Sequence, residues 1–252
     1  MTAKELKKAQ EDIDDQVKEL AETKGLTSGN NGCQPIRDGI ADEEAYLESG
    51  LKVAWILKEP YDDFNENGMP CGGGWSLTKN CFLEHDENWI DKNGHKQWKN
   101  RVWQVITYVM YGFRHGLYWE KMNRIRNEPS MMDEIKSVAW INLSKMPAKK
   151  TSSNGSFGYY YATAWESIVT KQISVYCPDV LIFGRTFNAF KQCYKGIVPE
   201  HEADLENWMG TIWHVGSQFW IDTLHPGRKG RIYVNALIDA LTRIQETIRQ
   251  RL

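Results

Sequence analysis

Three side chains that could do chemistry each stand at the end of a short apolar run. Glu59 follows the run VAWIL, Asn142 lies near the end of SVAWINL, and His225 follows FWIDTL. A carboxylate can activate water, an amide can donate and accept hydrogen bonds at once, and an imidazole can donate to an oxygen that gains negative charge. Because the carboxyl ends of parallel strands share one rim, these groups would converge on one cleft.

The elements that must position these side chains are four apolar runs separated by helical patterns. The runs are continuous rather than alternating, which predicts strands that are buried on both faces of a parallel sheet. They cover residues 53–57, 137–143, 179–184 and 219–224. Helical spacing recurs over residues 99–111 and 159–176 and from Val234 to Ile248.

The alternation of strand and helix predicts the α/β class. We expect a three-layer α/β/α domain with a central, mainly parallel four-stranded sheet. The segments TIWHV and QFWID around Gly216 could instead form a hairpin, which would add an antiparallel strand at one edge.

Two helices and a loop precede the first apolar run. Residues 2–23 have apolar side chains at helical spacing, residues 24–35 are rich in Gly, Ser and Asn, and a short helix is expected near residues 42–47. We therefore divide the chain into an N-terminal helical extension and loop, residues 1–48, and an α/β domain, residues 49–252, that together form one compact unit.

Composition narrows the class of protein. The 252 residues include 31 basic and 33 acidic side chains, so any binding to phosphate must depend on local basic loops. The five cysteines form no C-x-x-C pair, and no apolar run approaches about 20 residues. Without a signal peptide, a phosphate-loop motif or H-E-x-x-H, we expect a cytoplasmic monomer with no membrane span, cofactor or metal.

The order of the short motifs resembles that of the uracil-DNA glycosylase superfamily. In its best-known family the first strand ends in G-Q-D-P-Y, where this chain has LKEPY at residues 57–61. An aromatic residue and a serine follow, matched by Trp75 and Ser76. An asparagine closes the second strand, matched by Asn142, and the last strand runs into H-P-S, matched by HPG at residues 225–227.

The resemblance implies a role for each matched residue in excising a flipped base. Trp75 would stack on uracil, and Tyr61 would crowd the C5 position and reject a methyl group. Asn142 would read the pyrimidine edge by donating to one ring atom and accepting from another. His225 would donate to O2 of the leaving base, and Glu59 would position or deprotonate the attacking water.

The resemblance covers residues 50–240, mostly in four short patches, and it also implies contacts with phosphates. The predicted phosphate- and DNA-binding residues are Ser76, Gly227, Arg228, Lys229 and Arg231. The implied partner is DNA or a ligand that contains a nucleobase. Some members of the superfamily hold an iron–sulfur cluster through four cysteines, but the cysteine spacing here does not match theirs.

Several positions depart from the family pattern. Leu57 replaces a glycine, Glu59 replaces the catalytic aspartate, and Asp62 replaces a histidine. A displacement of about an ångström in a catalytic group can cost on the order of a hundredfold in rate. Lys229 falls nearest to the leucine that enters the duplex in the family, and lysine is a poor apolar wedge. We therefore expect single-stranded or unpaired DNA to be favoured.

Each of these residues also has a purely structural interpretation. Glu59 before Pro60 could cap a helix, Trp75 could be core, Asn142 could be a turn residue, and His225 could belong to a solvated loop. Three functions stay open: a glycosylase for uracil or a related lesion, a module that binds a nucleobase, nucleotide or nucleic acid without cleavage, and a hydrolase of small N-glycosides or amides. The glycosylase hypothesis requires the four side chains to line a single base-sized hollow.

Overall fold

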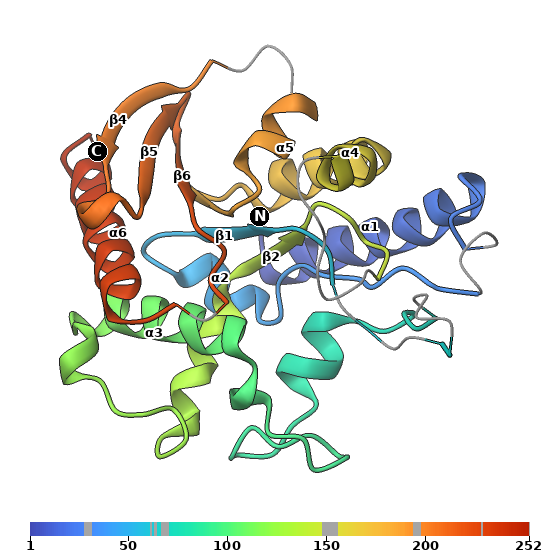
Figure 1. Cartoon of the computed structure of the whole chain (residues 1–252), viewed down its shortest axis with the longest axis horizontal. Coiled ribbons are helices and arrows are strands. Elements are labelled where there is room, and N and C mark those ends of the chain that lie inside the picture. The colour runs from blue at the N-terminus through green and yellow to red at the C-terminus, as the bar shows by residue number, and fades with distance from the viewer. Residues whose placement is uncertain are drawn as a thin grey trace.

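The computed structural model describes residues 1–27, 32–60, 62, 65–66, 71–147, 156–193, 198–227 and 229–251. The chain has a mixed α/β fold around a six-stranded sheet with the strand order β2-β1-β3-β6-β5-β4 (Figure 1). β1, β2, β3 and β6 run parallel, and β5 and β4 are antiparallel to their neighbours. The strands are β1 (Val53–Leu57), β2 (Ala139–Asn142), β3 (Val180–Gly184), β4 (Glu200–Asp204), β5 (Gly210–Val215) and β6 (Gln218–Thr223).

The sheet has six strands, so the prediction of a four-stranded sheet is wrong. All four predicted runs are strands, and they form its parallel part. The hairpin alternative around Gly216 is confirmed, because β5 and β6 pair antiparallel on either side of it. β4, with the sequence EHEAD, is a mostly exposed edge strand and therefore lacks the apolar signal that revealed the others.

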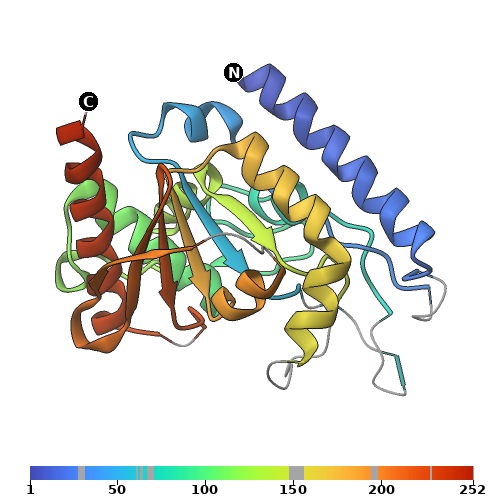
Figure 2. The same cartoon turned by 90° about the horizontal axis from the view of Figure 1, so that it is seen from above.

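Successive residues of the parallel strands enter two separate cores. Val53 and Trp55 belong to the core that α3 and α6 cover, whereas Ala54 and Ile56 belong to the core that α1, α4 and α5 cover (Figure 2). This burial on both faces explains why the runs are continuously apolar. The helices are α1 (Ala3–Thr23), α2 (Glu43–Glu48), α3 (Arg101–His115), α4 (Ser156–Tyr176), α5 (Phe187–Cys193) and α6 (Arg231–Arg251).

The predicted N-terminal helix packs on the α/β domain. It begins with a capping box, in which the backbone N–H groups of Thr2 and Glu5 each donate to the other residue's side chain. Leu6, Ile13 and Val17 are buried in the same core as α4, and the two helices lie side by side (Figure 2). The apolar stripe of α1 is therefore an integral part of that core.

Shorter helical segments connect the main elements. They are the π-helix η1 (Leu77–Leu83) and the 3₁₀ segments η2 (Gln97–Lys99), η3 (Trp119–Lys121), η4 (Pro129–Ser137) and η5 (Glu206–Trp208). Across the described ranges, every helix is too short or too polar to cross a membrane.

Candidate functional site

A cavity of about 260 Å³ lies at the carboxyl ends of β1 and β2, beside His225 in the segment that follows β6. The structure brings Glu59, Trp75, Asn142 and His225 together in its lining. Ligand pockets usually enclose about 300–1,000 Å³, so this volume suits a ligand as small as one base. The remaining lining residues are Leu57, Lys58, Pro60, Leu77, Cys81, Asn100, Val102, Trp103 and Trp140.

A buried charge network fixes the backbone of Asn142. Its N–H donates to Oδ2 of Asp38 at 2.7 Å, and both oxygens of Asp38 accept from the buried Lys145 ammonium at 2.8 and 2.9 Å. Gln172 from α4 completes the network, donating to Asp38 at 2.7 Å and accepting from Lys145 at 2.8 Å. These bonds hold the end of β2 in place from behind.

The side-chain amide of Asn142 is available to a ligand. Asn142 is only 5% exposed, yet within the described part of the chain its amide makes no hydrogen bond. Because Asn142 lines the cavity, water or a ligand there can bind its amide. An amide that lines a cavity in this state can donate to and accept from one edge of a bound ring.

The imidazole of His225 is held in one orientation as a neutral donor. The backbone N–H of Gly227 donates to Nδ1 at 3.1 Å, which places the ring proton on Nε2. Burial lowers the pKa of His225 below its ordinary value of 6.5, and the charges of Lys58, Lys229 and Arg185 lower this pKa further. At neutral pH the group therefore offers an uncharged N–H to the cavity.

Glu59 follows the end of β1 and is 8% exposed. The structural alternative was a helix cap, but the helical segment that follows it in the described residues begins only at Leu77. A carboxylate that lines a small hollow with a neutral imidazole can act as a general base toward water. The neighbouring Lys58 lines the same cavity and places a positive charge beside it.

Asp62 positions the indole of Trp75. The Oδ2 atom of Asp62 accepts from Nε1 of Trp75 at 2.7 Å and from the backbone N–H of Gly73. Gly73 has φ +101°, and a Cβ there would lie 1.8 Å from the carbonyl oxygen of Gln34, so only glycine fits this turn. The carboxylate of Asp62 thus fixes the orientation of an indole in the cavity wall.

The other predicted site residues have different surroundings. Ser76 is buried and caps η1, with its hydroxyl 3.3 Å from the N–H of Lys79 and 3.0 Å from the hydroxyl of Thr78. The N–H of Gly227 is used by His225. Arg231 lies 3.5 Å from Glu120 and outside the cavity lining.

Two predicted site residues, Tyr61 and Arg228, lie outside the described residues. Lys229 lies near enough to His225 for its charge to lower the pKa of that imidazole. Lys229, like Arg231, lies outside the cavity lining.

Sequence reasoning missed several residues of the cavity. Trp103 and Trp140 add two indoles to its wall, and Asn100 caps α3 beside them by accepting from the N–H groups of Val102 and Trp103. Trp140 lies in the run that ends in Asn142, so the strand assignment could have revealed it. The contribution of α3 had no signal in the sequence, because it depends on the packing of that helix against the strand ends.

The site has no thiolate nucleophile. Burial, reinforced by nearby acidic groups, raises the pKa of the Cys81 thiol to about 12. Among the residues that the structure describes, no group of three or more His, Cys, Asp or Glu side chains is arranged to hold a metal ion. The lining itself contains a carboxylate, an imidazole and an amide that can act on a bound ligand.

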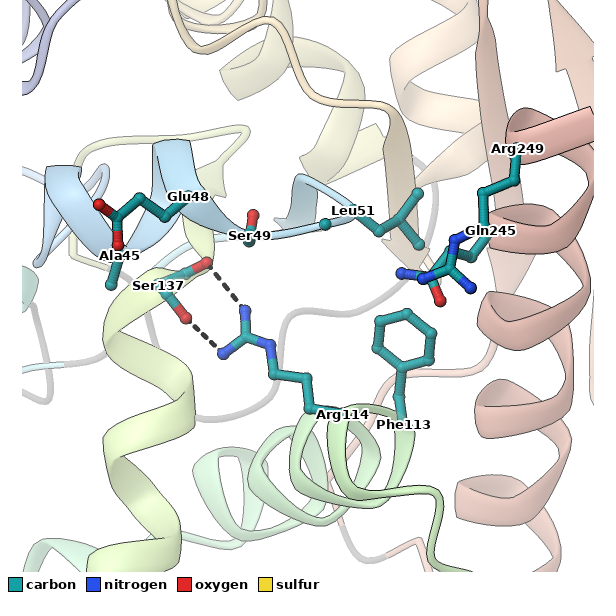
Figure 3. A pocket seen from close by; sticks show the side chains of 10 residues that line it. Ala45, Glu48, Ser49, Leu51, Phe113, Arg114, Ser137, Gln245 and Arg249 are labelled. Atoms are coloured by element: carbon teal, nitrogen blue, oxygen red, sulfur yellow. Dashed lines mark hydrogen bonds between the residues drawn. The ribbon is translucent and has the colours of Figure 1, made fainter. Parts of the chain in front are cut away.

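A second cavity, of about 460 Å³, lies at the amino ends of the parallel strands, where Leu51 precedes β1 and Ser137 precedes β2 (Figure 3). Arg114 reaches into it from α3 and is bound by the residues of η4. Its guanidinium donates to the carboxylate of Glu134, to the carbonyl oxygen of Glu134 at 3.2 Å and to the hydroxyl of Ser137. The donors of this arginine are therefore used inside the protein.

Comparison with known proteins adds no relationship. The chain matches no protein-family model, and no curated protein matches it. The geometry of the first cavity therefore carries the functional argument.

Proposed function

We propose that the protein is a uracil-DNA glycosylase-like hydrolase that excises uracil or a related damaged base from DNA. One observation carries this proposal: a carboxylate, an indole, an amide and an imidazole from separate segments line one base-sized cavity. The α/β class and the position of the cavity at the ends of parallel strands support it, and the uracil-DNA glycosylase-like layering is part of the proposal.

In the proposed reaction, the flipped base stacks on Trp75 and its polar edge meets the amide of Asn142. Glu59 orients water, takes its proton and stabilises the positive charge that develops on the sugar. His225 donates from Nε2 to the base oxygen O2 as the base leaves with the electrons of the N-glycosidic bond. A neutral imidazole can fill this role because its Nε2–H donates a hydrogen bond that stabilises the negative charge on O2 while the proton stays on the ring.

Excision of a labelled base tests the proposal. Purified protein is incubated with single-stranded and double-stranded oligonucleotides that contain uracil, and abasic sites are detected by alkaline cleavage. We expect product from the single strand in preference, and a large loss of product with Glu59→Ala, Asn142→Ala and His225→Ala. Absence of abasic product from both substrates, or full activity in the three variants, contradicts the proposal.

A second candidate is a module that binds a nucleobase or nucleotide without cleaving it. The internal contacts of three predicted phosphate-binding residues favour this candidate. Ser76, Gly227 and Arg231 each contact another residue of the protein, so fewer groups remain to bind the phosphates of a long DNA strand. Saturable binding of a nucleotide without turnover, lost with Trp75→Ala but kept with Glu59→Gln, would identify this function.

A further inference from the structure

The ends of β1 and β3 and the turn after β6 meet at one point beside the cavity. A side chain at Gly184 would come within 2.8 Å of Leu57 Cδ2 and 3.1 Å of Pro226 Cδ, so these three residues are in contact. The close approach requires glycine at position 184. The residues that come directly after Leu57 and Gly184 therefore begin close together on the rim of the cavity.

Three cations follow this contact point. Lys58 comes directly after Leu57 and lines the cavity, Arg185 comes directly after Gly184, and the N–H of Lys229 donates to the carbonyl of Pro226 at 3.1 Å. All three act on His225, because each of their charges lowers the pKa of its imidazole. We call Lys58, Arg185 and Lys229 the rim cations.

Two of the rim cations carry charges that no ion pair within the described residues neutralises. Within the described residues, neither the guanidinium of Arg185 nor the ammonium of Lys229 has an acidic partner at ion-pair distance. Positive charges that the ends of neighbouring strands bring to one place beside a cavity attract an anion.

The backbone of Arg185 is itself held in an unusual conformation. Its φ is +62°, in the left-handed region that residues with a side chain rarely adopt. Its N–H donates to the carbonyls of Phe183 at 2.9 Å and Thr223 at 2.8 Å, which fixes the residue between the ends of β3 and β6. Such strain is commonly found at ligand sites, and here it presents an exposed arginine at the rim.

We propose that the rim cations form an anion subsite, so that the ligand of the cavity is a phosphate-bearing nucleotide unit rather than a free base or nucleoside. The phosphate beside the bound base would lie against Arg185, Lys58 and Lys229. The base part of this proposal rests on the proposed function, whereas the anion subsite rests on the rim cations alone. It assigns phosphate contacts to Lys58 and Arg185, which the sequence motifs did not suggest.

Calorimetric titration tests this subsite. The probes are deoxyuridine 5′-monophosphate, deoxyuridine and inorganic phosphate, and the Glu59→Gln background prevents turnover. We expect the nucleotide to bind at least about tenfold more tightly than the nucleoside, since hydrogen bonds between charged groups are strong. Arg185→Gln and Lys58→Gln should each reduce this preference to about twofold or less. Their far-UV circular dichroism spectra should match that of the parent protein, which shows that the variants are folded.

Three further variants separate charge from structure. Arg185→Gly keeps the left-handed backbone and should lose the preference as Arg185→Gln does, whereas Arg185→Lys should retain part of it. Arg243→Gln is the matched control, because this exposed arginine of α6 pairs with Glu202 and should leave the preference unchanged. A preference that disappears with Arg243→Gln as well contradicts a local subsite.

The failure of this proposal can be told from the failure of the proposed function. If phosphate binds and depends on Arg185 while neither uracil compound binds better than phosphate, the subsite stands and the base-reading function fails. If the nucleotide and nucleoside bind equally, if the preference survives Arg185→Gln and Lys58→Gln, or if no probe binds at millimolar concentration, the subsite is overturned.

Discussion

Two cavities lie at opposite ends of the parallel strands, and both have polar side chains in their walls. We call the end at which these strands begin the amino edge and the end at which they finish the carboxyl edge. At the amino edge the guanidinium of Arg114 is bound by Ser137, which lines the same cavity, and by Glu134 behind it (Figure 3). At the carboxyl edge the amide of Asn142 has no partner within the described chain, and His225 is turned by Gly227 so that Nε2 carries its proton. The first arrangement stabilises the fold, and the second awaits a ligand.

The comparison shows that cavity size does not identify a functional site. The amino-edge cavity is larger, about 460 Å³ against about 260 Å³. What distinguishes the carboxyl-edge cavity is that the backbone of Asn142 is fixed from behind, by Asp38 and Lys145, while within the described residues its side-chain amide makes no hydrogen bond. Substitutions at the two edges should therefore affect different properties of the protein.

The largest expected effect is that of Glu59→Gln on excision. Loss of a general base usually lowers the rate by about 10²–10⁴-fold, so we expect single-turnover excision to fall by at least the lower figure. The matched control is Glu134→Gln, the same substitution beside the amino-edge cavity, which should leave the excision rate within about twofold because hydrogen bonds far from the cavity contribute to stability only. Equal losses of activity in both variants would remove the distinction between the two edges.

The next effect is on stability. Arg114→Ala removes the hydrogen bonds that Glu134 and Ser137 accept from the guanidinium, and it should lower the free energy of unfolding by about 1–3 kcal/mol. Urea denaturation followed by tryptophan fluorescence measures this loss. Excision by the folded variant should match that of the wild type, and an unchanged unfolding free energy would argue against a structural role for this arginine.

A smaller effect is expected from Asp62→Asn. The amide can still accept from the indole N–H of Trp75, but it lacks the charge that strengthens this hydrogen bond and the one from Gly73. We expect affinity for uracil-containing single strands to weaken by up to about tenfold, with kcat less affected, because a positioning residue acts on binding. Asp62→Ala should be weaker still; if both variants bind as the wild type does, Asp62 does not position Trp75.

The smallest effect is a shift in titration. Burial first, and then the rim cations, lower the pKa of His225 below 6.5, so removing a cation with Arg185→Gln should raise this pKa toward that value. As the pH falls, His225 is therefore protonated in the unfolded chain at a higher pH than in the folded chain. Stability from His225 is therefore complete above pH 6.5 and declines as the pH falls toward the folded pKa.

Proton NMR of the His225 ring across pH 4–8 measures this titration. Arg243→Gln serves as the control and should leave it unchanged. A wild-type imidazole that titrates above 6.5 would contradict the neutral donor at the carboxyl edge.

The parallel part of the sheet could be predicted from the sequence because burial on both faces leaves a continuous apolar run. β4 could not, since an exposed edge strand needs no apolar side chains. The gathering of Glu59, Asn142 and His225 could be predicted from strand topology, which fixes where parallel strands end, whereas Trp75 lies in a loop and was expected there only from the motif resemblance.

Finer features of the site depend on packing that no local pattern records. The bond between Asp62 and Trp75 spans a loop, and Arg185 reaches the rim only because Gly184 contacts Leu57 and Pro226. The same holds for Arg231, which a basic run suggested as a phosphate ligand but which the start of α6 places beside Glu120. A charge run gives the sign of a surface, and the turn of the backbone decides which of its members face a ligand.

A crystal structure of the protein with bound uracil tests the central claim most directly. We predict uracil in the carboxyl-edge cavity, stacked on Trp75, with its polar edge within hydrogen-bond distance of the Asn142 amide and its O2 facing Nε2 of His225. Uracil in the amino-edge cavity, or in the carboxyl-edge cavity without contact to Asn142, would contradict the account.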